Sequence, residues 1–384
     1  MIKVIEVSSD SNIGGAGKCI LTFLKTFDRS EFEVEAIVPA GSLLKPEIEN
    51  LKVKVFETEN LAEKSLDFNA IIRLRHMFKY LKPDVVHTHA SMSARIAAWS
   101  MGIPVVYTRH SVFPQSKKLT SFPGKQINGF INNMTADRII AVAEAAKDNL
   151  TETGIDARKI KVILNGVEPL APAMAEQTGK LRMLYHIRPD EKVAVMAARL
   201  NEVKGHKYFI EAAARLKKEG IKAKFLIAGT GDMEESLKKQ IADNNLEGYV
   251  IMMGFVKDVT PLMTLMDVQV NCSFGTEATS LALLEGMSLG KPAVVSEFGG
   301  NPGVITDGVN GFLTPIHDVD TLTEKLRLLF TDDKLYGVMS ENCRKVYSTK
   351  FTAEANTRAV EAVYKEAAAK RKNNKRKERE KNED

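Results

Sequence analysis

Short runs of apolar, β-branched residues alternate with longer stretches of helical periodicity along most of the chain. In the first half the runs predict strands at residues 2–8, 32–38, 53–57, 85–88, 105–108, 139–142 and 162–164. In the second half they predict strands at 193–197, 224–228, 250–253, 268–271, 293–296 and 311–313. Helical periodicity predicts helices at 17–25, 70–81, 207–217, 234–242, 282–289 and 321–329. Strands that are apolar on both faces and separated by helices indicate parallel sheets covered on both sides.

The alternation stops once, in a proline-containing stretch of small residues at 167–179, and then resumes. This break predicts an α/β protein of two Rossmann-like, doubly wound domains, at 1–168 and 181–350, joined by a linker at 169–180. A helix at 351–369 and a basic, disordered tail at 370–384 complete the predicted organisation.

Composition narrows the class of protein. The net charge is +5, and the last fifteen residues carry eight basic and four acidic side chains, so the body is nearly neutral and gives no reason to expect a nucleic-acid partner. The three cysteines lie far apart, which indicates a reduced, cytoplasmic protein without structural zinc. No signal peptide or membrane-spanning run is expected.

A glycine-rich loop, SDSNIGGAGK at 9–18, follows the first predicted strand. A Walker A loop would need Gly and Ser or Thr where the chain has Asn12 and Cys19, and a GxGxxG loop starting at Gly15 would need Gly or Ala at Ile20. Two interpretations remain. The loop is either a tight strand-to-helix turn or a backbone surface that approaches a phosphate or a sugar at a helix N-terminus.

Charged residues follow two predicted strands of the second half. Arg199 and Lys204 lie between the strand at 193–197 and a helix, where cations oppose the helix dipole unless an anion such as a diphosphate compensates them. Glu277 and Glu285 follow the strand at 268–271, with Thr279 or Ser280 as a natural N-cap between them. Considered alone, the cations also fit a solvated surface and Glu285 fits an ordinary helix face.

Two further groups belong to the same prediction. The amides of Ser280 and Leu281 would open the helix that carries Glu285 and face the same point as the cations. Phe255 and Val256 follow the strand at 250–253, where their backbone can face a nucleotide base.

The chain resembles the retaining glycosyltransferases of family 4, which have the GT-B fold, over nearly its whole length. The resemblance lies in the order and spacing of nine stretches. They are GGAG (14–17), DVVHTH (84–89), PVVYTRHS (104–111), ADRIIAVAEAAKDNL (136–150), KIKVILNGVE (159–168), RLNEVKGH (199–206), LIAGTGDMEESL (226–237), EATSLALLEGMSLGKPAVVSEFGG (277–300) and DGVNGFL (307–313).

The resemblance implies an acceptor-binding first domain and a nucleotide-sugar-binding second domain that face a central cleft, with the last helix returning to the first domain. Glu277 would contact the transferred sugar and Glu285 the donor ribose. The other implied roles fall to Arg199 and Lys204 on the diphosphate, to Gly15 in a loop over the phosphates, and to His110 beside the donor sugar. Ala278 and the stretch 301–303 depart from the family pattern, which leaves the donor sugar open.

Two patterns that resemble metal sites are weak. Asp318 and Asp320 form a DxD triplet at the start of a predicted helix, where capping explains them. His87 and His89 end a predicted strand without an evident third ligand. No metal or other cofactor is therefore expected, and Arg199, Lys204 and helix amides would stabilise the departing diphosphate.

The expected activity is metal-independent transfer of a sugar, with retention, from a nucleotide-diphosphate sugar, preferably a UDP-sugar, to a glycan, a lipid-linked or a small-molecule acceptor. The alternatives are a non-catalytic nucleotide-sugar-binding relative and a same-fold phosphorylase or epimerase. The basic residues on the helix at 70–81 and at Lys117 and Lys118 also allow peripheral contact with the anionic inner face of a membrane, although a solvated helix face explains them equally.

Overall fold

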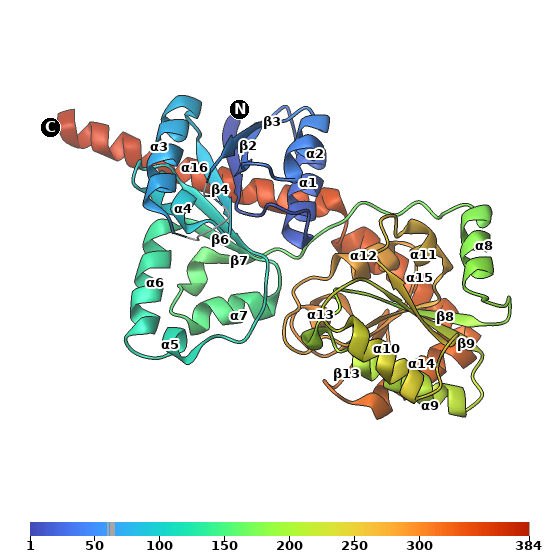
Figure 1. Cartoon of the computed structure of the whole chain (residues 1–384). Coiled ribbons are helices and arrows are strands. Elements are labelled where there is room, and N and C mark those ends of the chain that lie inside the picture. The colour runs from blue at the N-terminus through green and yellow to red at the C-terminus, as the bar shows by residue number, and fades with distance from the viewer. Residues whose placement is uncertain (60, 62–65, 384) are drawn as a thin grey trace. The chain divides into compact units, whose positions relative to one another are not determined.

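The computed structural model describes residues 1–59, 61 and 66–383, with side chains described as far as residue 370. The chain forms two compact units, each with its own parallel sheet (Figure 1). Unit 1 comprises Met1–Gly166 and the C-terminal segment from Ala353, and unit 2 comprises Val167–Thr352. The predicted pair of doubly wound domains is confirmed.

Unit 1 contains a seven-stranded sheet in the order β3-β2-β1-β4-β5-β6-β7. The strands are β1 (Ile2–Ser8), β2 (Phe32–Pro39), β3 (Lys54–Thr58), β4 (Val85–His89), β5 (Val105–Arg109), β6 (Arg138–Ala141) and β7 (Ile160–Val162). The helices are α1 (Gly15–Thr26), α2 (Leu44–Asn50), α3 (Phe68–Leu81), α4 (Met92–Trp99), α5 (Lys117–Thr120), α6 (Gly124–Thr135), α7 (Glu144–Glu152), η1 (Ala157–Lys159) and α16 (Ala353–Glu383).

Unit 2 contains a six-stranded sheet in the order β10-β9-β8-β11-β12-β13. The strands are β8 (Lys192–Ala197), β9 (Ala223–Ala228), β10 (Val250–Gly254), β11 (Val268–Asn271), β12 (Ala293–Ser296) and β13 (Gly311–Thr314). The helices are α8 (Ala175–Leu184), η2 (Glu202–Lys204), α9 (His206–Lys218), α10 (Glu234–Asp243), α11 (Thr260–Leu265), α12 (Leu281–Ser288), α13 (Asn301–Val304), α14 (Val319–Thr331) and α15 (Asp333–Lys350).

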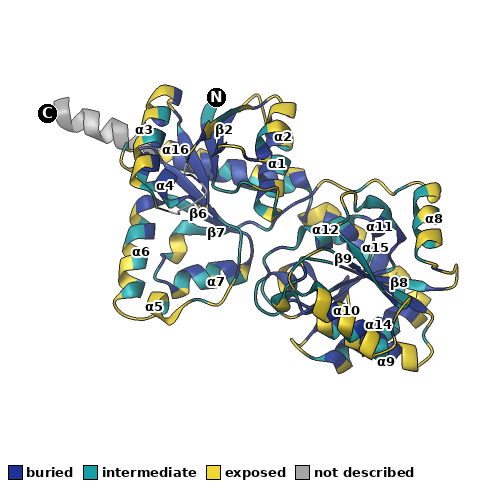
Figure 2. Cartoon of the chain, viewed as in Figure 1, coloured by how far each residue is buried: buried dark blue, intermediate teal, exposed yellow. Residues whose placement is uncertain are grey.

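Each sheet is buried between two helical layers, and the outer sides of the helices are exposed (Figure 2). In unit 1, α1, α2 and α16 share a core with one face of the sheet, and α3 and α4 share a core with the other. In unit 2, α9, α10 and α14 cover one face, and α8 and α11 pack on the opposite side. This arrangement explains why the central strands are apolar on both faces.

Helix α16 returns to unit 1, as predicted. Its Tyr364 is fully buried and makes edge-to-face contacts with Phe23 of α1 and Phe32 of β2. The backbone of α16 is helical as far as Glu383, where composition predicted a disordered tail from Lys370. Lys, Arg and Glu dominate this stretch, which contains neither Gly nor Pro, and these residues favour a helix.

The boundary between the units differs from the predicted linker. Residues 169–180 belong to unit 2, and α8 begins at Ala175 within them. Val167 forms a parallel bridge with Thr352, and its amide donates to Phe351 O at 3.0 Å. The chain therefore enters and leaves unit 2 on neighbouring segments.

Candidate active site

The predicted donor-site residues of unit 2 gather at the carboxyl ends of β8 and β11. These strands are adjacent, but β9 continues from β8 in one direction along the sheet and β12 from β11 in the other. Such a reversal of strand order leaves a crevice in which open α/β sheets bind ligands. Arg199 and Lys204 follow β8, and Glu277 follows β11.

The carboxylate of Glu277 is fixed by three donors. Its Oε2 accepts hydrogen bonds from Lys204 Nζ at 2.9 Å, Asn271 Nδ2 at 2.9 Å and Ser273 Oγ at 2.8 Å. Glu277 is buried, and a buried carboxylate needs such partners to remain charged. Lys204 also donates to Thr276 O at 3.0 Å, so it anchors the loop as well as the side chain.

The N-terminus of α12 lies directly after this loop. Ser280 is the N-cap, and its Oγ accepts from Leu283 N at 3.4 Å. Thr279 is buried, Leu281 begins the helix, and Glu285 is half-buried one turn further on. The Ser280 cap occupies the amide of Leu283, and the other amides at the start of α12 are the type of donors that bind anions.

Two glycines pack closely against the loop that carries Glu277. A Cβ on Gly299 would lie 2.2 Å from Glu277 O, and one on Gly300 would lie 2.2 Å from Ala278 O. Gly299 also has a φ of +59°. Because no other residue allows this approach, the glycine pair fixes the path of the backbone that carries Glu277.

The remaining predicted residues of unit 2 are more open to solvent. Arg199 is exposed, and among the described residues its guanidinium has no ion-pair or hydrogen-bond partner. Phe255 is 76% exposed, whereas Val256 packs partly against the core. An exposed cation and an exposed aromatic ring beyond β8 and β10 are suited to a phosphate and a planar base.

Gly15 and His110 belong to unit 1. Gly15 is the first residue of α1, and a Cβ built on it would have no heavy atom within 4 Å. By contrast, a Cβ on Gly17 would lie 3.0 Å from Leu44 Cδ2. Packing within the described chain is therefore tight at residue 17 and open at residue 15, where the absence of a side chain leaves space.

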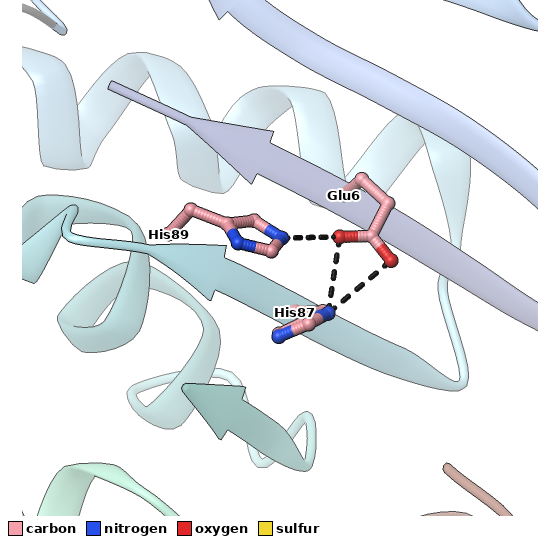
Figure 3. A group of neighbouring side chains, drawn as sticks. All are labelled: Glu6, His87 and His89. Carbon is pink, nitrogen blue, oxygen red and sulfur yellow. Dashed lines mark hydrogen bonds and ion pairs between the residues drawn. The ribbon is translucent and has the colours of Figure 1, made fainter. Parts of the chain in front are cut away.

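His110 follows β5 and ends a chain of hydrogen bonds through the sheet of unit 1. Its Nε2 lies 2.7 Å from His89 Nδ1, and His89 Nε2 lies 2.8 Å from Glu6 Oε2. Figure 3 shows Glu6 facing His87 and His89 from a neighbouring strand. These strands are β1 and β4, between which the strand order of this sheet reverses. On its other oxygen, Glu6 accepts from Tyr364 OH at 2.5 Å.

This network fixes which nitrogen of each ring carries a proton. Burial opposes ionisation of Glu6, but attraction to His87 and hydrogen bonds from His87 and His89 outweigh it and hold the pKa of Glu6 well below its usual range. An ionised Glu6 only accepts, so His89 Nε2 carries the proton. Burial and the nearby His87 lower the pKa of His89, so the ring is neutral and its Nδ1 is an acceptor.

The same reasoning extends to His110. Its Nε2 must donate to the unprotonated Nδ1 of His89. Burial, followed by the neighbouring imidazoles, lowers the pKa of His110 well below its usual range, so its Nδ1 carries no proton. His110 therefore presents a lone pair, which accepts a hydrogen bond from a hydroxyl group.

In the structure, Glu6 lies beside His87 and His89 and offers the third candidate metal ligand that was not evident in the sequence. Candidate ligand atoms of Glu6, His87 and His89 lie within 4.8 Å of one another. These atoms already bond to each other, and His87 Nδ1 also lies 2.6 Å from Tyr364 OH. We interpret the group as a carboxylate–imidazole network, because internal hydrogen bonds occupy the atoms that a metal would need.

The DxD triplet is explained by structure, as predicted. Asp318 is the N-cap of α14, and its Oδ1 accepts from Thr321 N at 3.0 Å. Asp320 is 89% exposed at its side chain and pairs with Arg215.

Sequence reasoning missed several residues of both sites. Asn271 and Ser273 were visible only as the end of a strand, and their contact with Glu277 depends on how the following loop folds back. Glu6 and Tyr364 lie 358 positions apart and meet because α16 returns to unit 1. The only local signal was an acid, Glu6, between the apolar residues Ile5 and Val7 of a predicted strand.

Comparisons with known proteins show the family and the fold of the chain. Residues 180–346 match the family Glycosyl transferases group 1, and residues 13–169 match Glycosyltransferase Family 4, so the two matches cover most of the chain. A UDP-Gal:alpha-D-GlcNAc-diphosphoundecaprenol alpha-1,3-galactosyltransferase from Escherichia coli is 29% identical over 94% of this chain and 96% of its own length. The glycosyltransferase EpsD of Bacillus subtilis, itself assigned only putatively, is 26% identical over 90% and 92%.

Solved structures show the same fold. Anabaena HepE in complex with UDP has a TM-score of 0.82 and 21% identity, and covers 95% of this chain and 100% of that one. A glycosyltransferase from Rickettsia africae has a TM-score of 0.83 and 21% identity over 95% and 98%. No helix in the described part of the chain has the length and apolar character needed to cross a membrane. The chain belongs to the family 4 (group 1) glycosyltransferases, which are retaining enzymes of the GT-B fold that use nucleotide-sugar donors.

Proposed function

We propose that this enzyme transfers a hexose from a UDP-sugar to a lipid-linked or glycan acceptor without a metal ion. The observation that carries the proposal is the fixed carboxylate of Glu277, held by Lys204, Asn271 and Ser273 beside the N-terminus of α12. A carboxylate held in this way is preorganised to stabilise positive charge that develops on a sugar.

The departing diphosphate requires positive charge and amide donors. Arg199, Lys204 and the first turn of α12 offer both at the carboxyl edge of one sheet. Gly15, with open space around its Cα, is suited to a loop that approaches phosphates closely. Glu285, one turn into α12, is the proposed partner of the ribose hydroxyls.

His110 is the proposed contact to the donor sugar from unit 1. Its unprotonated Nδ1 would accept a hydrogen bond from a sugar hydroxyl. The bond would orient the sugar, and the neutral ring would add no positive charge next to the developing oxocarbenium ion.

The relatives support the choice of substrates. The Escherichia coli relative is named for transfer of galactose from UDP-galactose to a GlcNAc-diphosphoundecaprenol acceptor, and it aligns over nearly the full length of both chains. Anabaena HepE has been solved with UDP-glucose. A UDP-hexose donor and a lipid-diphosphate-linked acceptor are therefore the first candidates.

The test is UDP release from a panel of UDP-hexoses, with and without a polyprenyl-diphosphate sugar acceptor and with EDTA present throughout. We expect acceptor-dependent release that EDTA does not abolish. The substitution Glu277→Gln should lower kcat by about 10²–10³-fold, because it removes a preorganised charge. Glu297→Gln, an exposed acid of the same unit beyond β12, is the matched control and should retain activity.

Three outcomes would contradict the proposal. Loss of turnover on chelation with recovery on adding manganese would show that a metal holds the diphosphate. Phosphate-dependent cleavage, or an epimerised sugar formed without acceptor, would favour a phosphorylase or an epimerase. Donor binding without turnover of any acceptor would favour a non-catalytic nucleotide-sugar-binding protein.

A further inference from the structure

Helix α6 of unit 1 presents apolar residues to solvent. Ile127 is 56% exposed, Phe130 68% and Met134 39%, and their spacing places them on one stripe of the helix. The residues that face the protein are small or polar, with Gly129 and Asn132 buried. A surface helix of a globular domain normally has the opposite arrangement.

Specific contacts hold α6 in this orientation. Asn132 Oδ1 accepts from the buried Arg95 of α4 at 2.8 Å, and Asn128 Nδ2 donates to Thr153 O at 2.8 Å. A Cβ on Gly129 would lie 2.3 Å from Gly154 O, so only glycine permits this packing. The helix cannot rotate its apolar stripe inward without losing these contacts.

The apolar surface continues into the segment before α6 and is flanked by positive charge. Phe122 is 82% exposed and Leu119 39%. Lys117 and Lys118 are exposed on α5, and Lys125 is half-buried at the start of α6. The sequence from 111 to 135 contains no acidic residue.

The charge decides between the possible partners. A second copy bound across a two-fold axis would bring the lysines of this segment against the same lysines, with no acid of the segment to pair them. A neutral apolar partner would leave the charges without a role. An anionic lipid bilayer offers negative headgroups to the lysines and an apolar layer beneath the headgroups to the exposed apolar side chains. It therefore accounts for both the charge and the apolar stripe.

We propose that the α5–α6 face, formed by Lys117, Lys118, Phe122, Ile127 and Phe130, binds the surface of an anionic lipid bilayer. The apolar side chains enter the interfacial layer and the lysines contact the headgroups. This inference deepens the proposed function, because membrane binding would bring the acceptor-binding unit to a lipid-linked acceptor. The purpose of the binding rests on the proposed function, but the binding itself does not.

The basic residues of the predicted contact on α3 are a separate group. Arg73 of that helix donates to Glu59 O and Arg75 bonds to Ser100 Oγ, whereas Lys79 and Lys82 are exposed. The lysine pair of the prediction, Lys117 and Lys118, remains part of the surface. The apolar stripe of α6 is the new element.

The test is sedimentation of the full chain with vesicles, without donor or acceptor. We expect binding to vesicles of equal parts phosphatidylglycerol and phosphatidylcholine, and about tenfold weaker binding to phosphatidylcholine alone or at high salt. Phe130→Glu should weaken binding to the anionic vesicles by tenfold or more, and the double variant Lys117→Gln/Lys118→Gln by about tenfold.

The controls come from unit 2. Met183→Glu changes an apolar residue that is even more exposed than Phe130, and Lys217→Gln/Lys218→Gln removes another adjacent lysine pair. Both should bind as the unchanged chain does. Absence of vesicle binding, or binding that the α5–α6 variants leave intact, would overturn the proposal. A dimer in light scattering that Phe130→Glu dissociates would instead assign the face to a second copy.

The two proposals fail separately. Vesicle binding needs no turnover, so a chain inactive on every UDP-hexose can still support the membrane surface. Conversely, Phe130→Glu should keep full activity on a short-chain, water-soluble acceptor while it loses activity on the same sugar presented in a bilayer. Equal loss on both acceptors would indicate a damaged fold.

Discussion

At the scale of single residues, the hydrogen-bond network from Glu6 to His110 determines which nitrogen of His110 is an acceptor, the atom that is proposed to contact the donor sugar. His89 lies 2.8 Å from Glu6 and 2.7 Å from His110. Because His89 donates to Glu6 from one nitrogen, its other nitrogen accepts from His110. In the proposed reaction, Glu6 and His89 would therefore be positioning residues. They would act on the reaction through His110 alone.

Glu6→Gln tests this role. Loss of the negative charge removes an attraction that favours protonated His89 and His110, so their pKa values should fall further. We expect kcat to drop about tenfold with donor KM nearly unchanged, and the acid limb of the pH–kcat profile to move to lower pH. Kinetics from pH 8 down to the lowest pH at which the protein stays folded measure both effects, because the pKa of His110 already lies well below the ordinary histidine value.

The control for this variant is Glu35→Gln, which changes another buried acid in the same sheet. Glu35 pairs with Lys3 on the neighbouring strand and lies outside the network. It should alter stability without moving the pH profile. If Glu6→Gln likewise lowers only stability and leaves the profile in place, the positioning role is excluded.

At the scale of elements, α16 is attached to unit 1 by a few strong contacts. Tyr364 donates to Glu6, Thr26 and Thr357 share a hydrogen bond of 2.5 Å, and Asp28 N donates to Glu361 at 2.7 Å. The first of these contacts also satisfies the buried carboxylate of the network. The last helix therefore contributes to both the fold and the site of unit 1.

Tyr364→Phe should lower the free energy of unfolding of unit 1 by about 2–3 kcal/mol, because it leaves a buried carboxylate oxygen with one donor fewer. Tyr347→Phe is the matched control in unit 2, where the buried hydroxyl donates to the neutral Val167 O at 2.7 Å. It should cost about 1 kcal/mol. Urea unfolding measures both, and equal losses would show that the carboxylate contact is not special.

Most helices and strands could be predicted from the sequence, whereas the contacts between them could not. Buried parallel strands such as β1 and β11 carry continuous apolar runs, and their predicted bounds match the observed Ile2–Ser8 and Val268–Asn271. Helix α6 was missed because its Gly and Asn residues disfavour a helix. The contact between Tyr364 and Glu6 depends on chain topology, which local periodicity does not encode.

At the scale of the whole molecule, both units bury neutral histidines, so acid should destabilise both. Burial, with a contribution from Lys204, lowers the pKa of His206 in unit 2 to about 4, and burial also lowers the pKa of His89 and His110 in unit 1. The unfolded chain takes up these protons near its ordinary pKa of 6.5, before the folded chain does. Protonation therefore favours unfolding as the pH falls below about 6.5.

The expected result is an unfolding free energy that is flat above pH 7 and falls between pH 6.5 and about 4. His206 alone should account for about 1.4 kcal/mol per pH unit in that window for unit 2. Urea titrations at several pH values, with the two unfolding transitions fitted separately, measure the slopes. His206→Gln should flatten the slope of unit 2 alone, while His76→Gln, at an exposed site on α3, should change neither. A slope in unit 2 that His206→Gln leaves intact would show that another group carries the pH dependence, and that the folded protein tolerates a charge at His206.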